Sequence, residues 1–206
     1  MRKVINMIVL LLVSLLPMVS FAQGTSKTGK KMKTDKKVLV VFFSHTGENY
    51  AVGNIEKGNT HIVAEMIADK TGGTLFEIVP EKEYPKTYKG CVDIAKEEKE
   101  SGARPAIKGD VPVESYDVIF IGYPNWWGDM PMPVYTFLEK HNWSGKTIIP
   151  FCTHEGSGLS GTEKHIAMTC KGATVGKGLA LRGATAQNKR EQAKATVNTW
   201  LDKQDF

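Results

Sequence analysis

Two short polar fragments, "SHTG" (residues 44–47) and "NT" (59–60), contain the residue types of an anion-binding turn. Their hydroxyl and backbone N–H groups can donate hydrogen bonds, and a helix predicted to start with the second fragment adds the positive end of its dipole. The eleven residues 48–58 separate the fragments, and Lys57 is the only basic residue among them. We therefore predict a phosphate site made mainly of neutral donors. An ordinary helix N-cap explains the same residues, because Ser, Thr and Asn are common caps.

A second polar segment, "GYPNWWGDMPMP" (122–133), contains two adjacent tryptophans between prolines. It follows a run of apolar residues that is typical of a buried strand. A large aromatic side chain at the carboxyl end of a strand is a suitable platform for a flat conjugated ring. Alternatively, the indoles fill a gap beneath the next helix, and we expect this of one of the two but not of both.

The third segment, "CTHEGSGLSGTEKH" (152–165), contains a GxGxxG pattern at Gly156, Gly158 and Gly161. Its position argues against dinucleotide binding, because the pattern does not open a first βαβ unit and no acidic ribose partner follows in "LALRG" (179–183). A flexible loop that offers backbone groups to the edge of a planar ligand fits better. A single "GKT" (145–147) lacks the upstream glycine of a phosphate-binding P-loop.

The rest of the chain supplies elements that would position these segments. Apolar runs predict five strands, and amphipathic spacing predicts a helix after each of them. This alternation indicates a largely parallel α/β sheet covered on both faces, and such sheets bind ligands beyond the carboxyl ends of their strands. The three polar segments follow the first, third and fourth strands. The predicted strands are 38–43, 74–80, 116–124, 146–153 and 174–181, and the predicted helices are 59–73, 87–102, 133–141, 160–171 and 186–204.

Composition divides the 206 residues into three parts. Residues 1–22 have a short basic start, an apolar stretch and a small-residue ending, as in a secretory signal peptide. A membrane anchor is the alternative, but the apolar run is shorter than the roughly 20 residues of a spanning helix and Pro17 interrupts it. We expect an exported, periplasmic protein without a stable membrane span. Residues 23–37 form a Lys-rich tether, either solvated or near an anionic membrane surface, and 38–206 form one domain.

The charge of the domain itself gives no reason to expect nucleic-acid binding. The leader and tether together contain eight of the 27 basic residues and one of the 22 acidic residues, which leaves 19 basic and 21 acidic side chains. The basic pI therefore comes from the N-terminal segments. No Cys/His cluster has the spacing of a metal site, and no Ser-His-Asp or paired-carboxylate arrangement favours hydrolysis. Cys152 and Cys170 could form a disulfide, but we favour packed free thiols for the three cysteines, with Cys91 as the third.

In combination, "FFSHTG…GNTHIVAEMIA", "GYPNWWGDMPMPVYTFLE" and "IPFCTHEGSG" resemble the flavodoxins over about residues 37–204. The resemblance implies a three-layer, doubly wound α/β fold with a five-stranded parallel sheet in the order 2-1-3-4-5. It also implies noncovalent FMN, with Trp127 as the stacking tryptophan and Gly128 as the glycine whose carbonyl can flip toward flavin N5. The implied cofactor-binding residues are Ser44, His45, Thr46, Gly47, Asn59, Thr60, Pro124, Asn125, Trp126, Trp127, Gly128, Thr153, His154, Glu155, Gly156, Ser157 and Gly158.

Two departures from the family pattern qualify this expectation. The phosphate signature usually runs continuously as T-G-N-T, so residues 48–58 are interpreted as an excursion that leaves the fragments adjacent and covers the cofactor or the docking surface. The third loop lacks the family's tyrosine, so the outer flavin face is open or is covered by His154 or Trp126. A protonated His154 would favour anionic reduced flavin.

The expected function is electron transfer by FMN to a redox partner protein or a small acceptor. One alternative is an FMN-dependent NAD(P)H reductase of quinones or nitro compounds. The other is a cofactor-less binding module, for which the divided phosphate turn is the main argument.

Overall fold

Strand β1 (Val38–Phe42) consists only of apolar residues, and all five are buried. In the computed structural model, which describes residues 34–206, the side chains of β1 alternate between two hydrophobic clusters. Val38, Val40 and Phe42 belong to one cluster, while Leu39 and Val41 belong to the other. A strand that is covered on both faces needs no polar alternation, which explains the continuous apolar run.

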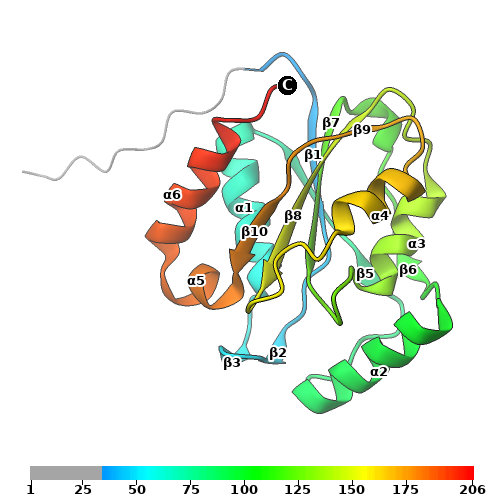
Figure 1. The fold of residues 1–206 in the computed structure, drawn as a ribbon, viewed down its shortest axis with the longest axis vertical. Coiled ribbons are helices and arrows are strands. Elements are labelled where there is room, and N and C mark those ends of the chain that lie inside the picture. The colour runs from blue at the N-terminus through cyan, green and yellow to red at the C-terminus, as the bar shows by residue number, and fades with distance from the viewer. Residues whose placement is uncertain (1–33) are drawn as a thin grey trace, which may run out of the picture.

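The main sheet has the strand order β4-β1-β7-β8-β10, and each neighbouring pair is parallel (Figure 1). Counted along the chain, this is the predicted order 2-1-3-4-5, and the doubly wound α/β fold is confirmed. The short strand β9 also pairs with β8. The remaining strands of this sheet are β4 (Thr74–Glu77), β7 (Val118–Pro124), β8 (Thr147–His154), β9 (Thr174–Val175) and β10 (Leu179–Arg182).

Helices cover both faces of the sheet (Figure 1). On one face lie α1 (Asn59–Thr71), α5 (Gly183–Asn188) and α6 (Arg190–Leu201). The other face is covered by α3 (Met132–Lys140) and α4 (Thr162–Thr169). Helix α2 (Tyr88–Ser101) lies lower, toward the edge at which β1 ends. A 3-10 turn, η1 (Val113–Ser115), precedes β7.

Three predicted elements are divided in the structure. The strand expected at 74–80 leaves the main sheet after Glu77, and β5 (Val79–Pro80) pairs with β6 (Ile107–Lys108) instead. The strand expected at 174–181 is interrupted between β9 and β10. The single helix expected at 186–204 is two helices, α5 and α6, with Lys189 between them in a non-helical conformation.

The segment between the two polar fragments forms a β-hairpin, which sequence reasoning treated only as an excursion. Its strands are β2 (Gly47–Asn49) and β3 (Gly53–Ile55), paired antiparallel. The hairpin projects from the edge at which β1 ends, the same edge toward which α2 extends (Figure 1).

The three cysteines, at positions 91, 152 and 170, are free and buried. This confirms packed thiols over a Cys152–Cys170 bridge. Burial raises the pKa of each thiol to about 12, with the charge of Glu98 contributing at Cys91. Between residues 34 and 206, no helix has the length and apolar character needed to cross a membrane, and no three His, Cys, Asp or Glu side chains are grouped as metal ligands. The predicted signal peptide and residues 23–33 of the tether lie outside the described residues.

Candidate functional site

A cavity of about 500 Å³ lies at the carboxyl ends of β1, β7 and β8. Nine of the predicted binding residues line it: His45, Asn59, residues 124–127 and residues 153–155. The others, Ser44, Thr46, Gly47, Thr60, Gly128 and residues 156–158, belong to the same three loops without lining the cavity. The fold therefore brings the three polar segments together at one edge, as expected of parallel strands.

The two fragments of the first loop meet at the start of α1. The Ser44 hydroxyl accepts a hydrogen bond from the backbone N–H of His61 at 3.1 Å. A methyl group added to Gly58 would lie only 2.1 Å from Ser44 Oγ, so the fragments are in direct contact. The hairpin between them loops outward, as predicted. The first turn of α1 contains no acidic residue, so nothing there opposes the attraction of its N-terminus for an anion.

A buried hydrogen bond connects the first loop to the third. The hydroxyls of Thr60 and Thr153 lie 2.7 Å apart, and both side chains are buried. One of these hydroxyls donates to the other, and this bond fixes the start of α1 against the end of β8. At the same junction, Asn59 packs so closely on Gly183 that a Cβ atom there would lie 2.3 Å from Asn59 Nδ2.

Two buried polar atoms of cavity-lining residues have no hydrogen-bond partner, namely His45 Nε2 and Asn59 Oδ1. His45 is 8% exposed and packs edge-on against Trp126. Burial, and secondarily the charge of Lys86, lowers the pKa of His45 to about 4, so its imidazole is neutral near pH 7. Leaving a buried polar atom unpaired is costly, and a ligand with polar groups would remove that cost.

The second loop makes a tight turn whose two central residues have positive φ. Trp126 and Asp129 exchange two backbone hydrogen bonds of 2.9 and 3.0 Å, and between them Trp127 has φ 55° and Gly128 φ 75°. Positive φ at both central positions defines a type I′ turn, which is unfavourable for a bulky residue such as tryptophan. The turn therefore holds Trp127 in a strained conformation, and strain of this kind is common at functional sites.

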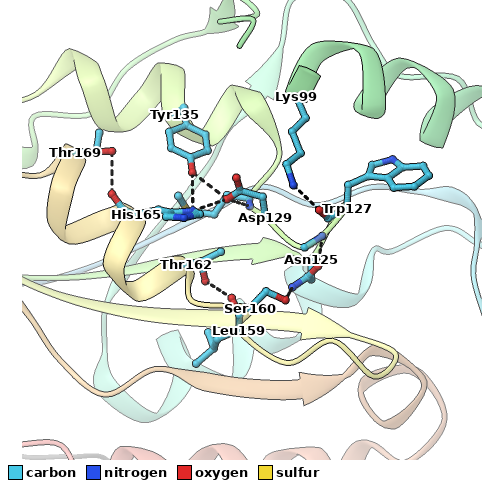
Figure 2. A network of polar contacts seen from close by, with 12 residues as sticks. Lys99, Asn125, Trp127, Asp129, Tyr135, Leu159, Ser160, Thr162, His165 and Thr169 are labelled. Atoms are coloured by element: carbon cyan, nitrogen blue, oxygen red, sulfur yellow. Dashed lines mark hydrogen bonds and ion pairs between the residues drawn. The ribbon is translucent and has the colours of Figure 1, made fainter. Parts of the chain in front are cut away.

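The contacts of the turn compensate for this strain (Figure 2). Lys99 Nζ donates to the carbonyl of Trp127. The indole Nε1 of Trp127 donates to Val92 O at 3.0 Å. Asn125 accepts from the N–H of Gly128 at 3.0 Å and donates to Gly158 O at 2.9 Å, so it joins the second loop to the third. The indole of Trp127 remains 50% exposed.

The neighbouring indole, Trp126, is partly buried and fills space within the core. Its ring centroid lies 5.3 Å from that of Phe43 and 5.1 Å from that of Tyr84. As predicted, one tryptophan of the pair packs inward and the other does not.

Asp129 anchors the far end of the turn, and sequence reasoning did not identify this role. Its Oδ1 accepts hydrogen bonds from Tyr135 Oη at 2.9 Å and from the backbone of Met130 at 2.8 Å, and it lies 3.0 Å from His165 Nδ1 (Figure 2). Burial and the bond to Asp129 raise the pKa of Tyr135. The turn is thereby fixed to α3 and α4, which contribute Tyr135 and His165.

The third loop holds the ring of His154 through a hydrogen bond from its own backbone. His154 Nδ1 accepts a hydrogen bond from the N–H of Gly156 at 2.9 Å, so this nitrogen carries no proton. Partial burial, followed by the charge of Arg182, lowers the pKa of His154. Both effects favour the neutral imidazole of His154, and the expectation that a protonated His154 would favour anionic reduced flavin stays a prediction.

The outer wall of the cavity comes from two elements that sequence reasoning did not place together. The hairpin contributes Glu48, Asn49 and Tyr50, and α2 contributes Tyr88, Cys91, Val92 and Ala95. The helical spacing of the α2 residues is visible in the sequence. The sequence does not show that this face of α2 lies beside the hairpin at the cavity, because that placement depends on tertiary structure.

Comparisons with known proteins agree with this geometry. A family model described as flavodoxin matches residues 37–203. A candidate flavoprotein from Bacteroides uniformis is 32% identical, with a TM-score of 0.62 over 82% of this chain and 99% of that one. A second, from Bacteroides eggerthii, is 28% identical, with a TM-score of 0.62 over 82% and 97%.

A flavoprotein from Lactobacillus acidophilus in complex with FMN is 25% identical, with a TM-score of 0.56 over 75% of this chain and 97% of that one. None of the curated proteins matches this sequence significantly.

The environment of His45 predicts a specific pH dependence of stability. Its pKa is about 4 in the folded protein and 6.5 in the unfolded chain. Between these values the unfolded chain binds more protons, so the free energy of unfolding decreases as the pH falls. At low pH, His45 lowers the free energy of unfolding by at most about 3 kcal/mol. This loss is absent above about pH 6.5.

Urea denaturation tests this expectation when the wild type and His45→Gln are compared near pH 7 and at about pH 4.5. The variant should lose less stability on acidification than the wild type, because it has no titratable ring. Equal losses in the two proteins would contradict the assignment.

Proposed function

Because the chain belongs to the flavodoxin family, we propose that it is an electron-transfer flavoprotein that binds FMN noncovalently in the cavity at the carboxyl edge of its sheet. The proposal rests chiefly on the two unpartnered buried atoms, His45 Nε2 and Asn59 Oδ1, at the place where the three loops meet. The FMN complex of the Lactobacillus acidophilus relative supports the choice of cofactor.

The residues present fit a ligand with a charged tail and a flat ring. The start of α1 and Thr46 of the first loop provide donors for a phosphate, and the first turn of α1 contains no carboxylate. The second and third loops provide an exposed indole at Trp127 and backbone polar groups at residues 153–158. When bound, FMN supplies the transfer of one or two electrons, and the protein supplies binding, orientation and control of access.

The decisive test of this proposal is the absorption spectrum of the natively expressed protein. We expect a yellow protein, or an apoprotein that binds added FMN in a 1:1 complex. Trp127→Ala should weaken FMN binding roughly three- to tenfold, because an aromatic pair contributes about 0.5–1.5 kcal/mol beyond its area burial. Met168→Ala is a matched control, since Met168 is 65% exposed and does not line the cavity. Colourless protein that fails to bind FMN would instead favour a cofactor-less binding module.

A second candidate function is that of a reductase for small planar acceptors such as quinones or nitroaromatic compounds. The specific observation in its favour is the group of exposed aromatic side chains around the cavity: Tyr50 is 66% exposed, Tyr88 43% and Trp127 50%. The rings of Tyr50 and Tyr88 lie 6.1 Å apart at the mouth. Exposed apolar patches of this kind often mark binding grooves.

Enzyme kinetics distinguish the two functions. An electron carrier should need a partner reductase, and we expect only slow oxidation of NAD(P)H by the isolated FMN-loaded protein in the presence of a quinone. Steady turnover without a partner would favour the reductase. In that case, Tyr50→Ala and Tyr88→Ala should raise the KM for the quinone more than they lower kcat, because both residues would bind the acceptor.

We also propose, from the N-terminal sequence alone, that the protein acts outside the cytoplasm. Cleavage after Ala22 would leave Gln23 as the first residue of the mature protein. Sequencing the N-terminus of protein recovered from the native envelope fraction tests this expectation, and an uncleaved Met1 would contradict it. A redox partner is a protein or small molecule that reduces or oxidises the loaded protein.

A further inference from the structure

Lys86 lies beside the divided anion-binding turn, although it is forty residues away from Thr46 in the sequence. Its Nζ donates a hydrogen bond to Thr46 Oγ1 at 2.6 Å. We propose that Lys86 is the cationic ligand of the cofactor phosphate and the residue by which this site selects FMN over riboflavin. This inference rests on the proposed function, and it replaces the expected phosphate site of mainly neutral donors.

The ammonium of Lys86 has no neutralising partner in the region that the structure describes. No carboxylate between residues 34 and 206 lies within ion-pair distance of it, whereas Lys57, the other lysine near this loop, pairs with Glu65 at 2.6 Å. The first turn of α1 has no acidic residue either. An ammonium without a carboxylate partner is a favourable environment for an anion, and the hydroxyl that it contacts belongs to the loop that precedes α1.

Thr46 is positioned to act together with Lys86. Because its oxygen accepts from the ammonium, its hydroxyl hydrogen remains available to a further acceptor such as a phosphate oxygen. Ser44 and Thr60, the other hydroxyl residues of the loop, already bond to His61 N–H and to Thr153 within the protein. Thr46 is the hydroxyl of this loop that contacts the ammonium of Lys86, so the two groups are placed to bind one external anion together.

The inserted hairpin holds Lys86 in this position. The N–H of Glu48 donates to Lys86 O at 2.7 Å, and Glu48 Oε2 accepts from the N–H of Tyr88 at 2.8 Å. Gly47, with φ 96°, lies so close that a Cβ atom there would be 2.6 Å from Lys86 O. The interruption of the phosphate turn therefore has a structural role, since the hairpin fixes the loop between β5 and α2 and brings a cation to the site.

His45 provides independent support for a ligand next to this cation. Its side chain is more than nine-tenths buried, it lines the cavity, and its Nε2 has no partner. The field of Lys86 reaches into the cavity, because this lysine is the second cause of the lowered pKa of His45. An anion bound near Lys86 would reduce that field.

Parallel titrations of the apoprotein with FMN and with riboflavin, followed by flavin fluorescence, test the inference. The two ligands differ only in the phosphate. We expect Lys86→Met to weaken FMN binding by about tenfold or more, as is typical for loss of a charge-assisted hydrogen bond, and to leave riboflavin binding unchanged. Lys86→Arg should retain most of the preference for FMN. Added salt should weaken FMN binding to the wild type more than to Lys86→Met.

Lys89→Met is the matched control. It removes the same charge three residues further along the chain, and the Lys89 side chain is already paired with Asp93 at 2.5 Å. It should leave the affinity ratio of FMN to riboflavin unchanged. If Lys86→Met leaves the affinity ratio of FMN to riboflavin unchanged, whether or not both affinities fall, the role of Lys86 is overturned while flavin binding stays established. Equal binding of both flavins by the wild type would overturn it too. A wild-type protein that binds neither flavin would refute the proposed function itself.

Discussion

The parallel pairing of β1, β7 and β8 is the constraint on which the site depends. It places the ends of three strands at one edge, so loops that are distant in sequence share a single cavity. The buried Thr60–Thr153 hydrogen bond then joins the first and third loops, and Asn125 joins the second and third. The site is therefore supported by contacts between loops as well as by the sheet below them.

This support explains how a strained turn persists beside a cavity. A tryptophan with φ 55° costs on the order of 1–3 kcal/mol. The cost is offset by contacts on both sides of the turn, with Lys99 and Val92 of α2 binding Trp127 and with Tyr135 and His165 holding Asp129. Since α2, α3 and α4 all contribute, the orientation of the exposed indole depends on the packing of one whole face of the protein.

The sequence pattern was sufficient to predict the five main strands and the loops that converge, and the resemblance to the flavodoxins implied the order of the strands. Continuous apolar runs such as 38–42 indicate strands covered on both faces, and their alternation with amphipathic segments indicates parallel pairing. The meeting of Ser44 with Gly58 followed from the expected looping-out of the residues between them. Local patterns could not predict the hairpin pairing, the docking of α2 or the Asp129 network, because each depends on which surfaces meet in the folded chain.

Lys86 illustrates the same limit. Nothing in the local sequence distinguishes it from the neighbouring lysines at positions 82 and 89. Its position depends on backbone contacts with the hairpin, which are independent of the identity of the lysine side chain. Its hydrogen bond to Thr46 is what distinguishes Lys86 from these lysines, and this contact is visible only in the folded structure.

The buried thiols have a consequence for the durability of the protein. With a pKa of about 12, Cys152 and Cys170 are almost entirely in the protonated form near neutral pH, and it is the thiolate that reacts with oxidants and disulfides. The native protein therefore resists oxidative damage at these two positions without any cross-link, and mispairing becomes a hazard only after the chain opens. The rate at which these thiols are alkylated would therefore measure how often the protein unfolds enough to expose its core.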